Sequence, residues 1–160
     1  MAKLSDLKLT YRIFMQAYRY RHFDWRPGAT LRKPLSQSQI AVVTTAAFFR
    51  PDQKPFDDSI PGGDCSFREI PADTDLAALR IAHKSDAFDH RGIEADRNLA
   101  LPLDRLRKLA QEGYLGSVAP RHFSLMGSIS APSRLVNITG PEIVRRLSED
   151  RTDAVLLTPV

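Results

Sequence analysis

The chain has 160 residues, of which 42% are hydrophobic and 26% charged, and its formal net charge is +4. This length allows one domain with a buried core, and the composition excludes a disordered or fibrous chain. No apolar stretch approaches the ~20 residues that span a bilayer, and the first residues lack the unbroken apolar segment of a signal peptide. Cys65 is the only cysteine. No internal disulfide can form, and we predict a cytoplasmic protein.

Residues 1–33 form a basic leader, with eight lysine or arginine residues against two aspartates. Aromatic residues are interleaved with these charges, a combination that can bind nucleic acid by charge and stacking. Apolar residues also recur at helical spacing from Leu7 to Tyr18. We favour the second pattern, an amphipathic helix that packs on the domain or on a partner, and predict no nucleic-acid partner and no membrane partner.

Residues 34–160 are predicted to form one α/β domain. Apolar, β-branched or aromatic runs predict strands at 40–47, 66–70, 79–83, 114–119 and 154–158. Helices are predicted at 102–112, where Pro102 opens and Gly113 ends an amphipathic run, and from Thr139, which begins a capping-box pattern. This alternation predicts a doubly wound, mostly parallel sheet of Rossmann-like or flavodoxin-like type, incomplete at its C-terminal end. Because 154–158 is apolar throughout, we expect it inside the sheet.

The candidate site lies at the carboxyl ends of these strands, where open α/β sheets bind their ligands. Thr44 and Thr45 are predicted to donate hydrogen bonds to a substrate. The candidate catalytic residues are His83, Asp89, His90 and His122, and Val160 marks the edge of the site. The loop at 50–64 is long and rich in proline, glycine and aspartate, as functional loops often are.

Three roles are open for the histidines. Imidazole and carboxylate groups can bind zinc or iron, but the spacing of His83, Asp89 and His90 matches no metal motif, and we predict no metal site. A histidine oriented by Asp89 could instead transfer protons. These polar residues could also only cap turns and satisfy loop backbone groups. Cys65 is expected to be a small packed residue rather than a reactive thiol.

Several motifs carry a resemblance that runs from about residue 34 to the last residue. They are VTTA followed by PxxxPFD, GDxSFR followed by IPAD, a DH pair before DxN, LPLDRL, GSxAxRHxSxMG and the final DAVLLTPV. In this order they resemble the selenoprotein B family of glycine, sarcosine, betaine and D-proline reductases, and most of all its D-proline branch.

The resemblance implies an oxidoreductase subunit that acts on a C–N bond of an amino acid. It implies a selenocysteine or cysteine directly after the strand that ends at Val160, so this chain has no cofactor of its own and is expected to be truncated and inactive alone. The selenol would attack the substrate carbon and a dithiol reductant would regenerate it. A sister subunit would carry a pyruvoyl group that holds the substrate amine. Because a helix is expected to begin there, its dipole would lower the pKa of the selenol or thiol.

Two other classes of function stay open. The chain could be a binding or assembly module of the same fold that carries no selenol. It could also be a metal-dependent hydrolase that uses His83, Asp89, His90 and His122.

Overall fold

A computed structural model describes residues 8–17, 24, 28–83 and 90–160. The chain divides into two compact units, Met1–Thr30 and Leu31–Val160. In the first unit, helix α1 spans Leu9–Ala17 and exposes the apolar side chains of Leu9 and Ile13. Of the apolar residues that predicted a leader helix, Tyr11 and Phe14 lie within α1, whereas Leu7 and Tyr18 lie outside the described residues.

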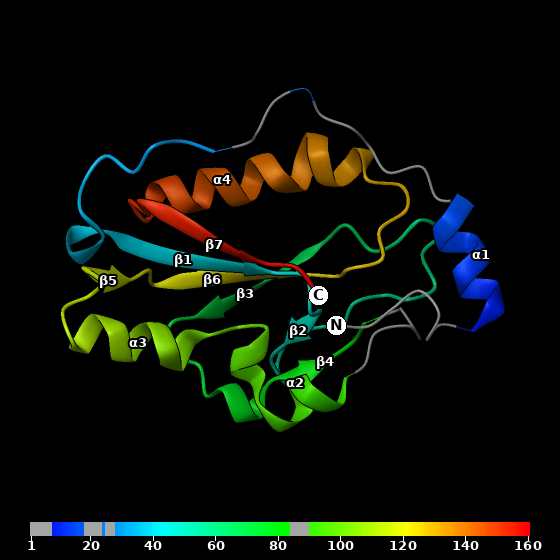
Figure 1. Ribbon diagram of the computed structural model, residues 1–160, viewed down its shortest axis with the longest axis horizontal. Helices are drawn as coiled ribbons and strands as arrows, with labels where there is room; N and C mark the ends of the chain where they lie inside the picture. The colour runs from blue at the N-terminus through cyan, green and yellow to red at the C-terminus, as the bar shows by residue number, and fades with distance from the viewer. Residues whose placement is uncertain (1–7, 18–23, 25–27, 84–89) are drawn as a thin grey trace. The chain divides into compact units, whose positions relative to one another are not determined.

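The second unit contains all the strands that the structure describes, together with several helices (Figure 1). The strands are β1 (Gln39–Thr44), β2 (Phe48–Phe49), β3 (Phe67–Pro71), β4 (Arg80–Ile81), β5 (Ser117–Val118), β6 (Arg121–Leu125) and β7 (Ala154–Thr158). The α-helices are α2 (Arg91–Ala95), α3 (Leu103–Gln111) and α4 (Gly140–Glu149). Short 3-10 turns are η2 (Leu35–Gln37), η3 (Leu76–Ala78) and η4 (Arg97–Leu99), and η5 (Leu135–Thr139) is a π-helix.

The main sheet is built around β1. One edge of β1 pairs in parallel with β7, and the other edge pairs in parallel first with β5 and then with β6. Strand β3 pairs with the far edge of β6 in the antiparallel direction. The α/β class is therefore confirmed, but the sheet is mixed, and the predicted doubly wound, Rossmann-like arrangement is not confirmed.

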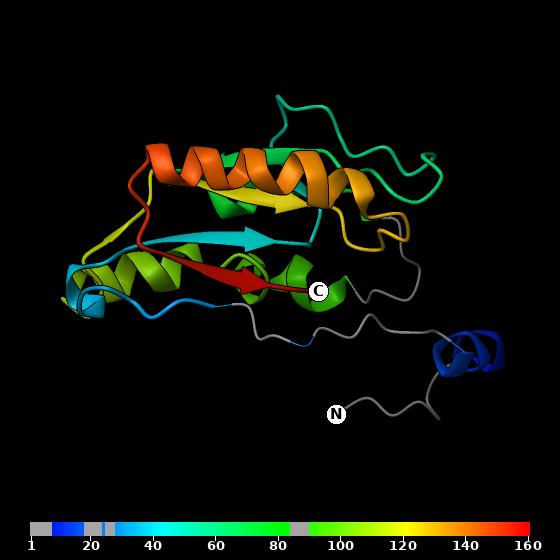
Figure 2. The ribbon, with the colours of Figure 1, turned by 90° about the horizontal axis from the view of Figure 1, so that it is seen from above.

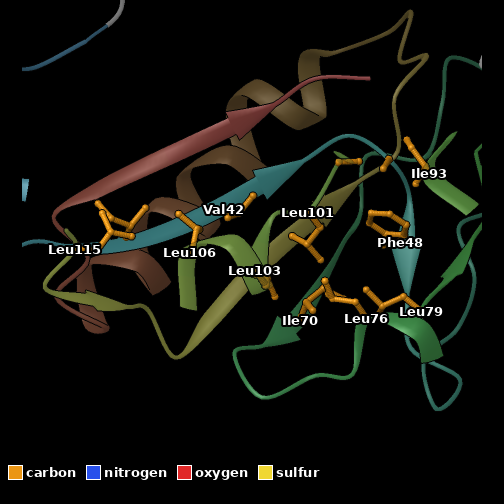
Figure 3. Packing of buried hydrophobic residues seen from close by; sticks show 13 residues of the cluster. Val42, Phe48, Ile70, Leu76, Leu79, Ile93, Leu101, Leu103, Leu106 and Leu115 are labelled. Atoms are coloured by element: carbon orange, nitrogen blue, oxygen red, sulfur yellow. The ribbon is translucent and has the colours of Figure 1, made fainter. Parts of the chain in front are cut away.

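Helices α3 and α4 cover opposite faces of this sheet (Figures 1 and 2). Because side chains alternate along a strand, Ile40 and Val42 of β1 face one way and Ala41 the other. Val42 belongs to the cluster that contains Leu103 and Leu106 of α3 (Figure 3). Ala41 belongs to the cluster that contains the buried side chains of α4. The β1 strand thus lies in the middle of the core.

The strand predicted at 40–47 is broken near its end. β1 stops at Thr44, and Ala47 has a positive φ of 54°, which turns the chain into β2. β2 pairs with β4 in a separate two-stranded antiparallel sheet. The predicted strand at 79–83 therefore shrinks to Arg80–Ile81, and its end is not one of the carboxyl ends of the parallel sheet.

The prediction that 154–158 lies inside the sheet is wrong. Among the described residues β7 pairs with β1 alone, so it forms an edge of the sheet. Its apolar side chains Val155, Leu156 and Leu157 are 38%, 40% and 68% exposed. An apolar run shows that a strand can be buried, but it does not show whether the strand has a neighbour on one edge or on both. The number of neighbours depends on the rest of the fold.

Two further elements differ from expectation. β6 was not predicted, and β5 keeps only two residues of the strand expected at 114–119. The helix expected to start at Thr139 begins earlier, as a π-helix at Leu135. Thr139 therefore has helical backbone angles, and its hydroxyl donates to the Cys65 carbonyl at 2.6 Å instead of capping the helix. The helix predicted at 102–112 is observed as α3.

Within the described ranges, no helix combines the length and the apolar character that crossing a membrane requires.

Candidate functional site

Thr45 joins the ends of β1 and β7. Its amide donates to the carbonyl of Thr158 at 3.3 Å. Its hydroxyl accepts a hydrogen bond from the Val160 amide at 3.0 Å and donates to the Val160 carbonyl at 3.3 Å. One side chain thus holds both backbone groups of Val160 at the carboxyl edge of the parallel strands.

Thr44 uses its hydroxyl within the fold. The side chain is fully buried, its oxygen accepts from the Ala46 amide at 3.2 Å, and its proton goes to the Thr158 carbonyl at 3.3 Å. Because this proton is already shared with the end of β7, Thr44 is better placed to hold the two strand ends together than to bind a ligand.

His83 reaches the same edge from β4. The Ala82 amide donates to the Ala47 carbonyl at 3.1 Å, which anchors the chain just before the histidine. On the other side, the Gly127 amide donates to the Thr45 carbonyl at 2.9 Å. A Cβ atom added to Gly127 would lie 2.4 Å from the Nε2 atom of His83. The imidazole therefore rests directly on Gly127, beside the end of β1.

His90 lies next to His83. The two ring centroids are 6.2 Å apart and the rings meet edge to face at 85°. Burial lowers the pKa of the half-buried His83, and the neighbouring His90 lowers it further. His83 is therefore mainly neutral at pH 7, and when protonated it releases its proton more readily than an exposed histidine.

The third member of the predicted cluster, Asp89, lies outside the described residues. Within the residues that are described, no group of three or more histidine, cysteine, aspartate or glutamate side chains is arranged to hold a metal ion.

His122 is not part of this edge. It is the second residue of β6, fully buried, and its Nδ1 accepts the Val42 amide proton at 3.0 Å. The register of β6 on β1 pairs Phe123 with Val43, so His122 lies level with Val42, two residues before the end of β1. Burial, and secondarily the charge of Arg107, lowers its pKa to about 4. The structure therefore brings together Thr45, His83, His90 and Val160, and leaves His122 in the core.

The loop at 50–64 is organised by two charged side chains. The Arg68 guanidinium donates to the carbonyls of Lys54 and Pro55, at 2.6 and 3.0 Å, and lies 4.2 Å from the centroid of the Phe56 ring. Burial opposes ionisation of Asp64, but its hydrogen bonds with Ser66 and from the Asp57 amide outweigh burial and lower its pKa. A cavity of about 360 Å³ is lined by Lys54, Pro55, Asp57, Ile60, Asp64, Ser66 and Arg68.

Sequence reasoning missed two residues of this edge, Gly127 and Ala47. Gly127 ends the motif GSxAxRHxSxMG, and its position after an apolar run was the available signal. Ala47 gave no signal, because alanine rarely adopts a positive φ and nothing local marks the turn. Backbone strain of this kind is concentrated at functional sites.

The fold is that of an α/β protein, and Thr45 and His83 lie at the carboxyl ends of parallel strands, where open α/β sheets usually bind their ligands. The model of the family described as glycine/sarcosine/betaine reductase selenoprotein B matches residues 6–160. The chain belongs to this family, as the sequence motifs predicted.

Relatives of known name are subunits of amino-acid reductases. The chain is 35% identical over 134 residues to D-proline reductase subunit gamma of Acetoanaerobium sticklandii, an alignment that covers 84% of this chain and 52% of that protein. It is 26% identical over 151 residues to the sarcosine reductase complex component B subunit beta of Peptoclostridium acidaminophilum, covering 94% and 34%. The betaine reductase complex component B subunit beta of the same organism is 30% identical over 131 residues, covering 79% and 29%.

The chain thus spans about half the length, or less, of these relatives. No solved structure matches it.

Proposed function

We propose that this chain is part of a subunit of an amino-acid reductase complex that cleaves a C–N bond, with a substrate of the D-proline, glycine, sarcosine or betaine type. The observation that carries the proposal is the convergence of Thr45, His83 and Val160 at one edge of the sheet, in a chain of this family.

In this proposal the residues of the chain have separate tasks. Thr45 holds the backbone of Val160, and through it the position of the residue that follows in the longer protein. That residue, a selenol or thiol by family resemblance, would supply the nucleophile and the electrons, while a pyruvoyl group on a sister subunit would hold the substrate amine. For D-proline, glycine or sarcosine, the protonated form of His83 gives a proton to the leaving nitrogen, because these amines leave as neutral molecules only when the nitrogen is protonated. The quaternary nitrogen of betaine would leave without this proton. Proton transfer of this kind contributes roughly 10²–10⁴-fold to a rate.

The nucleotides that follow the Val160 codon provide the first test. We expect TGA followed by an open frame, and a longer protein made with cysteine at that codon should reduce one of the four substrates in the presence of a dithiol and the sister subunit. The chain ending at Val160 should show no turnover, because the nucleophile is missing. Turnover by the shorter chain alone would overturn the proposal. A TAA or TAG codon with no frame behind it would favour the assembly module.

A further inference from the structure

The backbone conformation of Gly127 does not require glycine. The glycines with a positive φ in the described residues are Gly28, Gly62, Gly63 and Gly113. Gly127 is not among them, so its backbone conformation is open to alanine. What limits a side chain at this position is therefore space.

The space beside Gly127 is occupied by His83. An added Cβ atom would come within 2.4 Å of Nε2 and 3.3 Å of Cε1 of the imidazole, and within 3.2 Å of the Thr45 carbonyl oxygen. A distance of 2.4 Å is far inside van der Waals contact, so the ring would have to move. The ring is the end of a side chain, whereas the backbone of Gly127 is held by its amide hydrogen bond to the carbonyl of Thr45, the residue after β1, at 2.9 Å.

We propose that Gly127 is a positioning residue, which acts by leaving room for the His83 imidazole next to Thr45, the residue whose hydroxyl holds Val160. The inference rests on the proposed function, since it names how that site aims its proton donor. Both partners are fixed by the same stretch of backbone. The Thr45 carbonyl holds Gly127, and the Ala47 carbonyl holds Ala82 before His83. A methyl group at 127 therefore displaces the ring while the strands stay paired.

The test compares Gly127→Ala with Gly92→Ala in the whole chain by NMR titration of the histidine rings, with His83→Ala used to assign the signals. Gly92 is the matched control, because a Cβ atom there meets only the flexible Leu99 side chain, at 3.4 Å. In Gly127→Ala the pKa of His83 should rise toward its ordinary value of 6.5, since the ring leaves its half-buried position. In Gly92→Ala it should not change. An unchanged titration of His83 in Gly127→Ala would overturn the inference.

Thermal unfolding shows whether a methyl group at position 127 collides with the His83 ring or with the Thr45 carbonyl. Adding Gly127→Ala to a His83→Ala chain should shift the melting temperature by less than about 4 °C, because the ring is already gone. A larger loss would mean that the methyl group collides with the Thr45 carbonyl, and would also overturn the inference.

The longer protein with its sister subunit then tests the reaction. Gly127→Ala should lower kcat at least tenfold and shift its pH profile, whereas Gly92→Ala should do neither. Wild-type protein that shows no turnover, together with the expected NMR result, would refute the proposed function and leave the positioning of His83 intact. Unchanged kcat and pH profile in Gly127→Ala, in an active complex, would overturn the inference.

Discussion

His122 takes the place of a backbone carbonyl in the main sheet. β1 pairs with β5 through Ile40 and with β6 from Val43 onward, and the Val42 amide between them finds no strand carbonyl. The His122 Nδ1 atom accepts that proton, which requires the neutral ring. A histidine that sequence reasoning placed in the active site is thus part of the sheet.

Lowering the pH should weaken the fold through His122. Its pKa is lowered from 6.5 to about 4, so its contribution to the free energy of unfolding is complete above pH 6.5 and is lost as the pH falls toward 4. The loss is on the order of 3 kcal/mol, at about 1.4 kcal/mol per pKa unit. Urea unfolding at pH 7 and pH 4 should show a smaller loss for His122→Asn, which keeps an acceptor and does not titrate. His83 is present in both proteins, so its effect cancels, and equal losses would contradict the assignment.

Thr45 should control the order of the chain at Val160. Thr45→Val removes the hydroxyl that binds both backbone groups of Val160, so the Val160 amide should exchange with solvent roughly 2–10 times faster, as expected for one net hydrogen bond. Hydrogen exchange followed by NMR measures this rate. Thr45→Ser keeps the hydroxyl and should exchange like the wild type. The assignment fails if Thr45→Val leaves the rate unchanged.

The two strands of the parallel pair β1–β7 differ in burial, so the same kind of substitution should cost more stability in β1 than in β7. Val42 is fully buried in β1, whereas Leu157 of β7 is 68% exposed. Val42→Thr buries a hydroxyl and should lower the free energy of unfolding by about 1–3 kcal/mol. Leu157→Thr, measured by the same urea unfolding, should cost less than about 1 kcal/mol, because the site is already solvated and threonine suits a strand. Similar costs at both positions would show that β7 is covered.

At the scale of the whole molecule, the buried core that the structure describes lies in the unit Leu31–Val160. Every buried hydrophobic residue that the structure describes falls between Ile40 and Leu147. Residues 31–160 made alone should therefore unfold cooperatively, with a free energy of unfolding within about 1 kcal/mol of the full chain, because they keep every core residue that the structure describes. Circular dichroism in urea measures both proteins. Residues 48–160, which lack β1, should not fold, and a folded product without β1 would contradict its central place in the core.

Local sequence determined the elements whose signals are local. Pro102, the apolar face of the following turns and Gly113 were enough to place α3 within a residue at each end, because capping and helical periodicity act over a few residues. The motifs from VTTA to DAVLLTPV were enough to identify the family. The apolar run at 40–47 located the central strand, although not the turn at Ala47 that ends it.

Tertiary structure alone decided which residues meet. His83 and Gly127 are far apart in sequence, and they come together only because Ala82 and Gly127 both bond to backbone carbonyls of residues 45–47. The burial of His122 depends on where β5 ends and β6 begins along β1. The sequence of neither strand indicates these positions. The exposure of β7 likewise depends on its neighbours. The residues of a segment show which kinds of contact it can make. Which strand or side chain it meets depends on segments that are distant in sequence. The candidate site is formed by such long-range contacts.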